Sequence, residues 1–226
     1  MKINSLCIEL ALDFCSITLK NYNKLYYKEY INVSQNTKTI IQAIDLILLE
    51  SNMRYKDIDF IVFGDYPNNL MNSKAISIII KSLFFTWKIP IMKINSLLTL
   101  SLEIFSLYEN NSILIFIETN ENTLLYCKCI FEKKKLLNFN IKELISIKEF
   151  EEKNLNNFIL IINCDKKIVD FLKSNYRFMK IEENILPKSL YTNLIIEELI
   201  LKKKELNHNN IKLSYLIKNS FIKYKY

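Results

Sequence analysis

Glycine occurs once in this chain of 226 residues, and this scarcity limits both what the chain can fold into and what it can catalyse. Average usage of about 7% would give roughly 16 glycines in a chain of this length. Backbone positions that need a positive φ, or that approach a phosphate group closely, normally require glycine. Asn, Ile, Leu and Lys take its place, which is typical of mutational drift in an AT-rich genome. The composition therefore argues against chemistry that depends on a glycine-rich loop.

The chain is basic, with 31 Lys and Arg against 24 Asp and Glu and a formal net charge of +7. A basic protein suggests an RNA or a membrane surface as its partner. However, AT-rich codons favour lysine, and the lysine clusters at 133–135 and 202–204 are not interleaved with aromatic residues as in a surface on which bases stack. The charge therefore predicts solvated lysines, and a basic RNA-binding module remains an alternative.

The five cysteines are odd in number and lie mostly in apolar runs that predict strands. Two of them form a Cys-x-Cys pair that would point to one face of a strand, but neither a second pair nor a nearby histidine completes a zinc site. We expect free, buried thiols in a reducing cytosol and no metal site. The five are Cys7, Cys15, Cys127, Cys129 and Cys164.

Neither the N-terminus nor the apolar stretches predict a membrane protein. The sequence begins directly with a predicted strand, so no signal peptide is expected. The most apolar stretch, 75–92, is broken by two lysines and a proline and falls short of a membrane span. We therefore expect a cytoplasmic protein without a membrane partner.

Hydrophobic periodicity predicts two halves of similar α/β organisation, with a boundary near 108–112. The first half is expected to contain strands at 3–9, 14–20, 24–31, 57–64 and 91–94 and helices at 39–50, 74–87 and 96–107. The second is expected to contain strands at 112–118, 123–132, 136–140, 158–163 and 176–181 and helices at 148–154, 165–174 and 188–205. The predicted domains are therefore 1–108 and 109–226, with the last helix a candidate to pack back on the first domain.

Two helices of the first half have different apolar surfaces. The helix at 39–50 has one apolar stripe, which excludes Leu46 and Leu49. The helix at 74–87 has only a narrow polar strip and is apolar elsewhere, so it must be covered on both sides. One side can pack on its own sheet, and the other needs a further layer or another chain. The stripe contains Ile40, Ala43, Ile44, Ile47 and Leu48, and the polar strip contains Lys74, Ser77 and Lys81.

The stretch from Gly64 to Lys74, GDYPNNLMNSK, follows a predicted strand and opens a predicted helix. It resembles the signature G-R-G-P-G-S-F-T-G-x-R of the TsaB family, in which a strand, a proline turn and a helix follow in that order. Gly64, Pro67 and Lys74 match the signature in register, whereas several positions between them depart from it.

Other segments resemble the family in order and spacing, well over 3–107 and thinly over 108–187. They are LCIELA (6–11) for the family's L-A-I-D-T-A, CSITL (15–19) for C-S-V-A-L, NSL (95–97) for S-T-L, FIE (116–118) with Tyr126 for the strand pair I-D-A-R and Y, and YLIK (215–218) for the terminal Y-L-R.

The resemblance implies an α/β fold of two tandem actin-like (ribonuclease H-like) lobes, each a mixed sheet with flanking helices. It also implies a non-catalytic subunit that binds TsaD, the paralogue that attaches threonylcarbamoyl to the adenosine beside the anticodon of ANN-decoding tRNAs. TsaB pairs with TsaD through the first two helices of each N-lobe. The TsaE ATPase is then expected to dock on the pair, and tRNA is expected to bind only through the complex.

The resemblance also implies which residues meet the partner, while leaving open whether the free chain forms a homodimer. The expected partner-binding residues are Ile40, Ile41, Ile44, Ile47, Leu48, Lys74, Ile78, Lys81 and Phe85.

The sequence offers no catalytic constellation. Where the family has Asp-Thr-Ala, this chain has Glu9-Leu10-Ala11, so the hydroxyl is lost. Glu9 and Glu118 could in principle hold Mg²⁺, but exposed loop carboxylates are the simpler interpretation. His208, the only histidine, lies among asparagines, so no Ser/His/Asp triad or histidine metal site can be assembled. We expect no catalytic residue, cofactor or metal; a residual nucleotide-binding enzyme of the actin superfamily is the second alternative.

Overall fold

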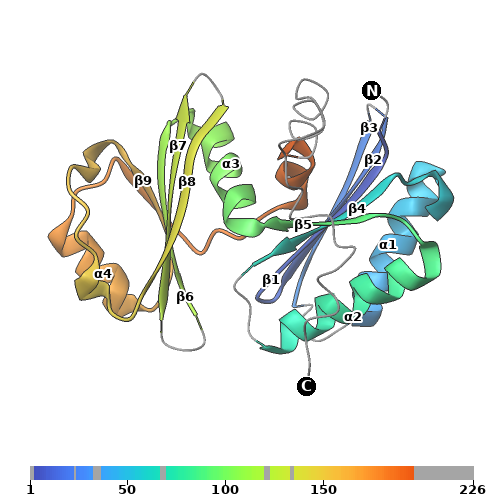
Figure 1. Ribbon diagram of the computed structural model, residues 1–226, viewed down its shortest axis with the longest axis horizontal. Helices are drawn as coiled ribbons and strands as arrows, with labels where there is room; N and C mark the ends of the chain where they lie inside the picture. Colours follow the sequence, from blue (N-terminus) through green and yellow to red (C-terminus); the bar gives the residue numbers. More distant parts are fainter. Residues whose placement is uncertain are drawn as a thin grey trace, which may run out of the picture. The chain divides into compact units, whose positions relative to one another are not determined.

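The computed structural model describes residues 3–22, 24–32, 37–66, 70–119, 123–132 and 135–195. They form two compact units, each built on a five-stranded sheet (Figure 1). The first unit contains β1 (Ser5–Ala11), β2 (Phe14–Asn21), β3 (Lys24–Ile31), α1 (Thr37–Ser51), β4 (Phe60–Asp65), α2 (Leu70–Trp87) and β5 (Ile91–Asn95). After α3 (Ser96–Tyr108), the second contains β6 (Ser112–Glu118), β7 (Leu124–Glu132), β8 (Lys135–Leu144), β9 (Ile159–Asn163), α4 (Lys166–Asn175) and β10 (Lys180–Glu183).

The two sheets repeat one topology. Their orders are β3-β2-β1-β4-β5 and β8-β7-β6-β9-β10. In each, the first three strands form an antiparallel meander, and the fourth and fifth run parallel to the first. The predicted fold class, two tandem lobes with mixed sheets and flanking helices, is confirmed.

The core of the first unit lies between its sheet and the helices α1 and α2, which are neighbours on one face of the sheet (Figure 1). Side chains alternate across a strand. Leu6, Ile8 and Leu10 of β1 therefore all enter this core and are essentially fully buried. The intervening residues of β1 face the other side of the sheet, and these include Glu9.

The core of the second unit between its sheet and α4 is rich in aromatic rings. Phe150 contacts three of them edge-on: Phe116, Tyr126 and Tyr176, with ring centroids 4.9, 5.3 and 5.1 Å away. Val169 and Leu172 of α4 complete this cluster. On the opposite face of the same sheet, Phe105 of α3 stacks on Phe131 of β7 at 4.5 Å.

The division between the units differs from the sequence-based boundary. The first unit runs to Thr99 and resumes at Lys188, and the second comprises Leu100–Pro187. The boundary thus lies within α3 rather than after it, because the first turn of that helix contacts the first unit. Residues 189–195 are helical and belong to the first unit, whereas the rest of the helix predicted at 188–205 lies outside the described residues.

Several predicted elements have different bounds. The helix predicted at 148–154 is wrong: short 3₁₀ turns at Ile147–Glu149 and Leu155–Asn157 replace it. Between them Phe150 is buried but residues 151–154 are polar, so no apolar stripe forms, and Asn154 adopts a left-handed conformation that a helix cannot continue. The last strand, predicted at 176–181, instead begins at Lys180 and ends at Glu183, and α2 begins earlier than 74.

Left-handed backbone positions are filled without glycine. Among the described residues, eight have positive φ, and all eight are residues other than glycine. Three of them directly follow a helix: Asn52 after α1, Lys88 after α2 and Glu109 after α3. Their amides donate back into the last helical turn, as in the usual glycine-capped helix end. Side-chain-bearing residues therefore occupy helix ends where the backbone favours glycine.

Candidate partner-binding surface and buried carboxylate cluster

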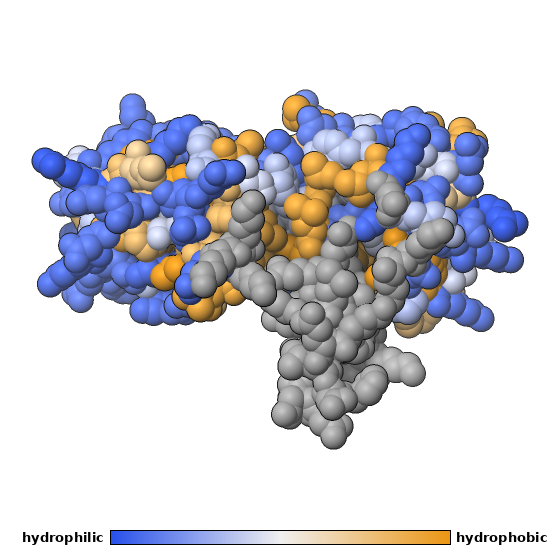
Figure 2. Space-filling model, turned by 90° about the horizontal axis from the view of Figure 1, so that it is seen from above, coloured by the Kyte–Doolittle hydropathy of each residue, from blue (hydrophilic) through white to orange (hydrophobic). Residues whose placement is uncertain are grey.

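Large apolar side chains remain exposed on α1 and α2. Leu49 of α1 and Phe85 of α2 each keep 74% of their surface accessible, Ile78 59% and Ile41 45%. On α2, Ile78 and Phe85 are seven residues apart and therefore lie on the same side of the helix. On the face drawn in Figure 2, most exposed residues are hydrophilic, with apolar patches between them. Exposed apolar side chains on two neighbouring helices are typical of a surface that binds another protein.

Polar groups border this apolar surface. Lys81, which lies between Ile78 and Phe85 on α2, is exposed, as are Asp45 and Gln42 on α1. Ser82 and Thr86 bond back to carbonyl groups one turn earlier, at 2.9 and 2.7 Å. A mixed surface of this kind can add hydrogen bonds around an apolar centre when a partner binds.

Three of the predicted partner-binding residues are placed elsewhere. Ile40, Ile44 and Ile47 are at most 1% exposed and belong to the core of the first unit. They form the stripe with which α1 packs on its own sheet, so their side chains are not available to a partner. Leu48 is half-buried against the same core. Of the predicted residues, Ile41, Ile78, Lys81 and Phe85 remain on the surface, and the side chain of Lys74 lies outside the described part.

A second feature is a buried cluster around Glu9 on the opposite face of the first sheet. Its carboxylate is fully buried and accepts hydrogen bonds from three hydroxyl groups. Ser96 Oγ lies 2.5 Å from Oε2, Thr192 Oγ1 2.6 Å from Oε1, and Thr99 Oγ1 3.0 Å from Oε1. Ser96 and Thr99 lie in the first turn of α3, where the helix macrodipole also favours a negative charge.

Gly64, the only glycine, lies against this carboxylate. A Cβ atom at position 64 would be 1.6 Å from Oε2 of Glu9 and 2.4 Å from Oγ of Ser96. Its φ is not in the left-handed region. Glycine is therefore required here for space rather than for backbone conformation. Of the other signature residues, Pro67 lies outside the described residues.

Further hydroxyl and amide groups attach the helical segment 189–195 to the same face of the sheet (Figure 1). Ser189 is bonded through Oγ to Thr18 at 2.8 Å, and its amide donates to Ser16 at the same distance. Ser5 donates to Asn193 at 3.0 Å. These groups are almost completely buried, so they fix the segment to the sheet as one polar layer.

No known protein-family profile matches the sequence. The chain is 24% identical over 196 residues to the tRNA threonylcarbamoyladenosine biosynthesis protein TsaB of Buchnera aphidicola subsp. Acyrthosiphon pisum, covering 80% of this chain and 86% of that protein. It is 23% identical over 133 residues to the protein of the same name from Haemophilus influenzae, covering 57% and 54%. Together these matches support the TsaB family as the family that this chain resembles. Its fold is shared with YeaZ from Pseudomonas aeruginosa, with a TM-score of 0.76, 10% identity and coverage of 89% and 94%.

The interpretation of Glu9 as an exposed loop carboxylate is wrong, because its side chain is fully buried. Glu9 is committed to three hydroxyl donors, and Glu118 accepts the amide of Asp165 at 2.9 Å. Among the described residues, no group of three or more His, Cys, Asp or Glu side chains could hold a metal ion. No helix of that same part of the chain is long and apolar enough to span a membrane.

The cysteines are free, as predicted. Four are buried, and Cys164 is half-buried. Burial beside the Glu9 carboxylate raises the pKa of Cys15 to about 12, and burial near Glu118 raises that of Cys164 to about 12. Both thiols therefore stay protonated at neutral pH and are poor nucleophiles.

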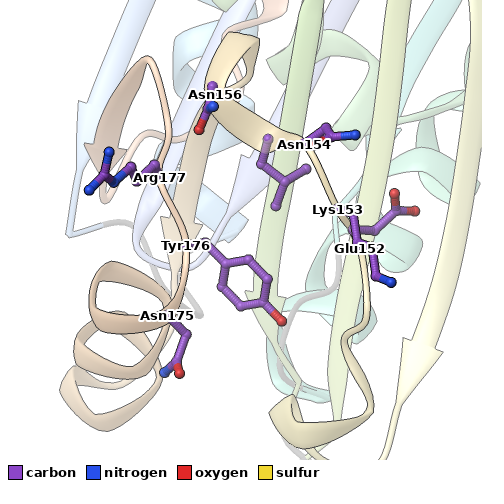
Figure 3. A pocket seen from close by; sticks show the side chains of 8 residues that line it. Glu152, Lys153, Asn154, Asn156, Asn175, Tyr176 and Arg177 are labelled. Carbon is purple, nitrogen blue, oxygen red and sulfur yellow. The ribbon is translucent and has the colours of Figure 1, made fainter.

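A shallow depression in the second unit is lined by residues of the 150–157 loop and the end of α4 (Figure 3). Tyr176 lies in its middle and donates to the carbonyl of Phe150 at 2.6 Å. Lys153 and Glu152 lie on one side of it and Arg177 on the other. Their charged groups do not converge on one point, so the depression is not a candidate site.

Sequence reasoning missed the partners of Glu9, which come from distant segments and carry no local pattern. It also left out Leu49, although a signal existed: an apolar residue outside the buried stripe of α1 must face solvent or a partner.

Proposed function

We propose that this chain is a non-catalytic subunit that binds a TsaD-like protein in tRNA threonylcarbamoyladenosine biosynthesis. The exposed apolar faces of α1 and α2 carry the proposal, because they leave Leu49, Ile78 and Phe85 without cover within the first unit. Packing against two helices of the partner would bury them. The names of its relatives, which are tRNA threonylcarbamoyladenosine biosynthesis proteins, supply the pathway.

The further parts of the proposal concern the rest of the assembly. The TsaD-like subunit performs the threonylcarbamoyl transfer, a TsaE-like ATPase docks on the pair, and tRNA is bound through the complex in the cytoplasm. The buried cluster around Glu9 supports a structural rather than a catalytic role for this chain, because its carboxylate is closed off from solvent and from substrates.

The test is co-purification of this chain with its cognate TsaD-like protein. Phe85→Asp and Leu49→Asp, singly and together, place a charge on the proposed interface, where an unpaired charge is costly. If Phe85 is a central contact, the single substitution weakens association by about ten-fold or more. Thermal stability of the isolated chain should hardly change, since both side chains are exposed.

Ile145→Asp is the matched control. Ile145 is 80% exposed in the second unit, so the substitution makes the same chemical change away from α1 and α2. Failure of the wild-type proteins to associate, or equal association of the double variant and the control, would refute the proposal. Sedimentation of the chain alone shows whether the same face forms a homodimer.

The alternative of a residual nucleotide-binding enzyme makes a different prediction. It requires the isolated chain to bind or hydrolyse ATP with Mg²⁺. We expect neither in calorimetry and phosphate-release assays, and clear turnover by the isolated chain would overturn the non-catalytic assignment.

A further inference from the structure

An aromatic pair lies on the surface where α1 and α2 end. Tyr55, in the 3₁₀ turn Tyr55–Asp57 after α1, stacks on Trp87, the last residue of α2, with ring centroids 5.5 Å apart and an interplanar angle of 21°. Trp87 is the only tryptophan of the chain. It packs against the core of the first unit and is therefore fixed in position. Tyr55, in contrast, is 38% exposed.

Three cations flank this aromatic pair. Arg54 and Lys56 adjoin Tyr55 in the sequence, and Lys88 follows Trp87; all three are exposed. Lys56 Nζ lies 5.9 Å from the centroid of the Tyr55 ring. Arg54 contacts Asp57 at 3.6 Å, whereas Lys56 and Lys88 form no ion pair within the described part of the chain. The Lys56 charge thus remains available beside the Tyr55 ring, and Lys88 adds a second charge next to Trp87 in the sequence.

We propose that Tyr55 and its cations form a contact for single-stranded RNA, with a base stacked on the Tyr55 ring and phosphates near Lys56, Lys88 and Arg54. Every base has a π-face, so such stacking tolerates sequence, and flanking lysines follow the backbone. The carboxyl ends of α1 and α2 carry partial negative charge, so an anion is favoured here only because the cations outweigh it. The inference rests on the proposed function only for the source of the RNA, an unpaired tRNA segment. It departs from the expectation that tRNA binds only through the complex, because it gives this chain an RNA contact of its own.

The geometry favours RNA over an apolar protein partner. Tyr55 is 38% exposed and Trp87 is half-buried, so the pair offers far less surface than a stable protein interface buries. Base stacking needs only one ring, and the neighbouring positive charges complement phosphate groups.

Trp87 supplies the measurement. Because it is the only tryptophan and touches Tyr55, its fluorescence should change when a base stacks there. The isolated wild-type chain is titrated with a single-stranded RNA of roughly ten nucleotides, a typical length for such grooves. A duplex RNA of the same length and an acidic peptide of matching charge are the comparison ligands.

Tyr55→Ala should weaken binding of the single strand by about ten-fold, within the range measured for loss of one stacked base. Tyr55→Phe keeps the ring and should bind as the wild type does. Lys56→Glu with Lys88→Glu should weaken binding and flatten its salt dependence. The control pair, Lys148→Glu with Lys167→Glu, makes the same charge change on exposed lysines of the second unit.

The outcomes are distinguishable from those of the partner-binding proposal. Tyr55→Ala should still associate with the TsaD-like protein, and Phe85→Asp should still bind RNA. The inference is overturned if wild-type fluorescence and affinity do not respond to single strands, if Tyr55→Ala and Tyr55→Phe bind equally, or if duplex or peptide binds as tightly. If the control pair weakens RNA binding as much as the Lys56 and Lys88 pair does, the loss reflects net charge alone. That result would also overturn the inference.

Discussion

Gly64 is the only glycine of the chain, and its surroundings leave no space for a side chain. Its missing Cβ leaves room for the Glu9 carboxylate and the Ser96 hydroxyl. Gly64→Ala should destabilise the protein by about 1–3 kcal/mol, because the cluster is buried and its members cannot move apart without losing hydrogen bonds. The measurement is the free energy of unfolding from urea denaturation.

A second substitution checks the cause. Glu9→Asp shortens the side chain and should recover part of the loss when combined with Gly64→Ala, since contacting residues are not additive. If the double variant is no better than the sum of the single variants, the contact with Glu9 is not the reason that glycine is kept.

At two helix ends, in contrast to position 64, a change to or from glycine has the opposite sign: introducing glycine should stabilise the protein. Lys88 and Glu109 have φ values of 58° and 51°, which cost a side-chain-bearing residue about 1–2 kcal/mol relative to the right-handed region. Glycine removes this strain but loses more entropy on folding. Lys88→Gly and Glu109→Gly should therefore each stabilise the protein by roughly 0.5 kcal/mol, seen as a higher melting temperature. Ser82→Gly, in the interior of α2, should destabilise it by up to about 1 kcal/mol.

At the residue scale, the sequence shows which residues are unusual but not why. It identifies Gly64 as the single glycine and Leu49 as an apolar residue off its stripe. The reason for Gly64 lies in Glu9 and Ser96, which come from other segments, and no local pattern joins them. Likewise, Tyr55 and Trp87 have no shared motif, and only the packing of two helix ends brings them together.

At the element scale, the helical segment 189–195 depends on buried hydroxyl groups rather than on an apolar stripe alone. Thr192→Val preserves shape but removes one of the three donors to Glu9. This should cost about 1–3 kcal/mol, because the carboxylate cannot recover the bond from water. The segment should also open more often, which limited proteolysis measures as faster cleavage.

Thr86→Val is the control for this prediction. The Thr86 hydroxyl bonds within α2 and is exposed, so its loss should change stability by less than about 0.5 kcal/mol. Equal effects of the two substitutions would mean that the Glu9 cluster does not hold the segment.

Hydrophobic periodicity predicts helices and strands well where one face of the element is buried. It fails where tertiary contacts determine the local structure. The meander β1–β3, the strands β6 and β9 and the helix α4 follow their apolar patterns closely. The segment 148–154 was predicted as a helix, yet its own Phe150 packs into the aromatic cluster and the chain forms two short turns. Tertiary packing outweighs weak local preference there.

At the scale of the whole molecule, the two units have separate cores, so a defect in one need not destroy the other. Phe116 is completely buried in the second unit and contacts Tyr126 and Phe150. Phe116→Ala should destabilise this unit by about 3–5 kcal/mol through the cavity that it leaves. The fluorescence of Trp87 should report unfolding of the first unit, in which it lies, whereas the circular dichroism of the whole chain reports unfolding of both units.

In the wild type the two signals can coincide, because both units can unfold together. In Phe116→Ala the circular dichroism should begin to fall at a lower urea concentration than the Trp87 signal, which marks loss of the second unit first. Ile145→Asp, an exposed change in the same unit, should leave both signals unchanged. Coincident transitions in Phe116→Ala would mean that the units unfold as one cooperative structure. Because α1 and α2 belong to the first unit, separate transitions would also predict that this variant still binds the TsaD-like partner.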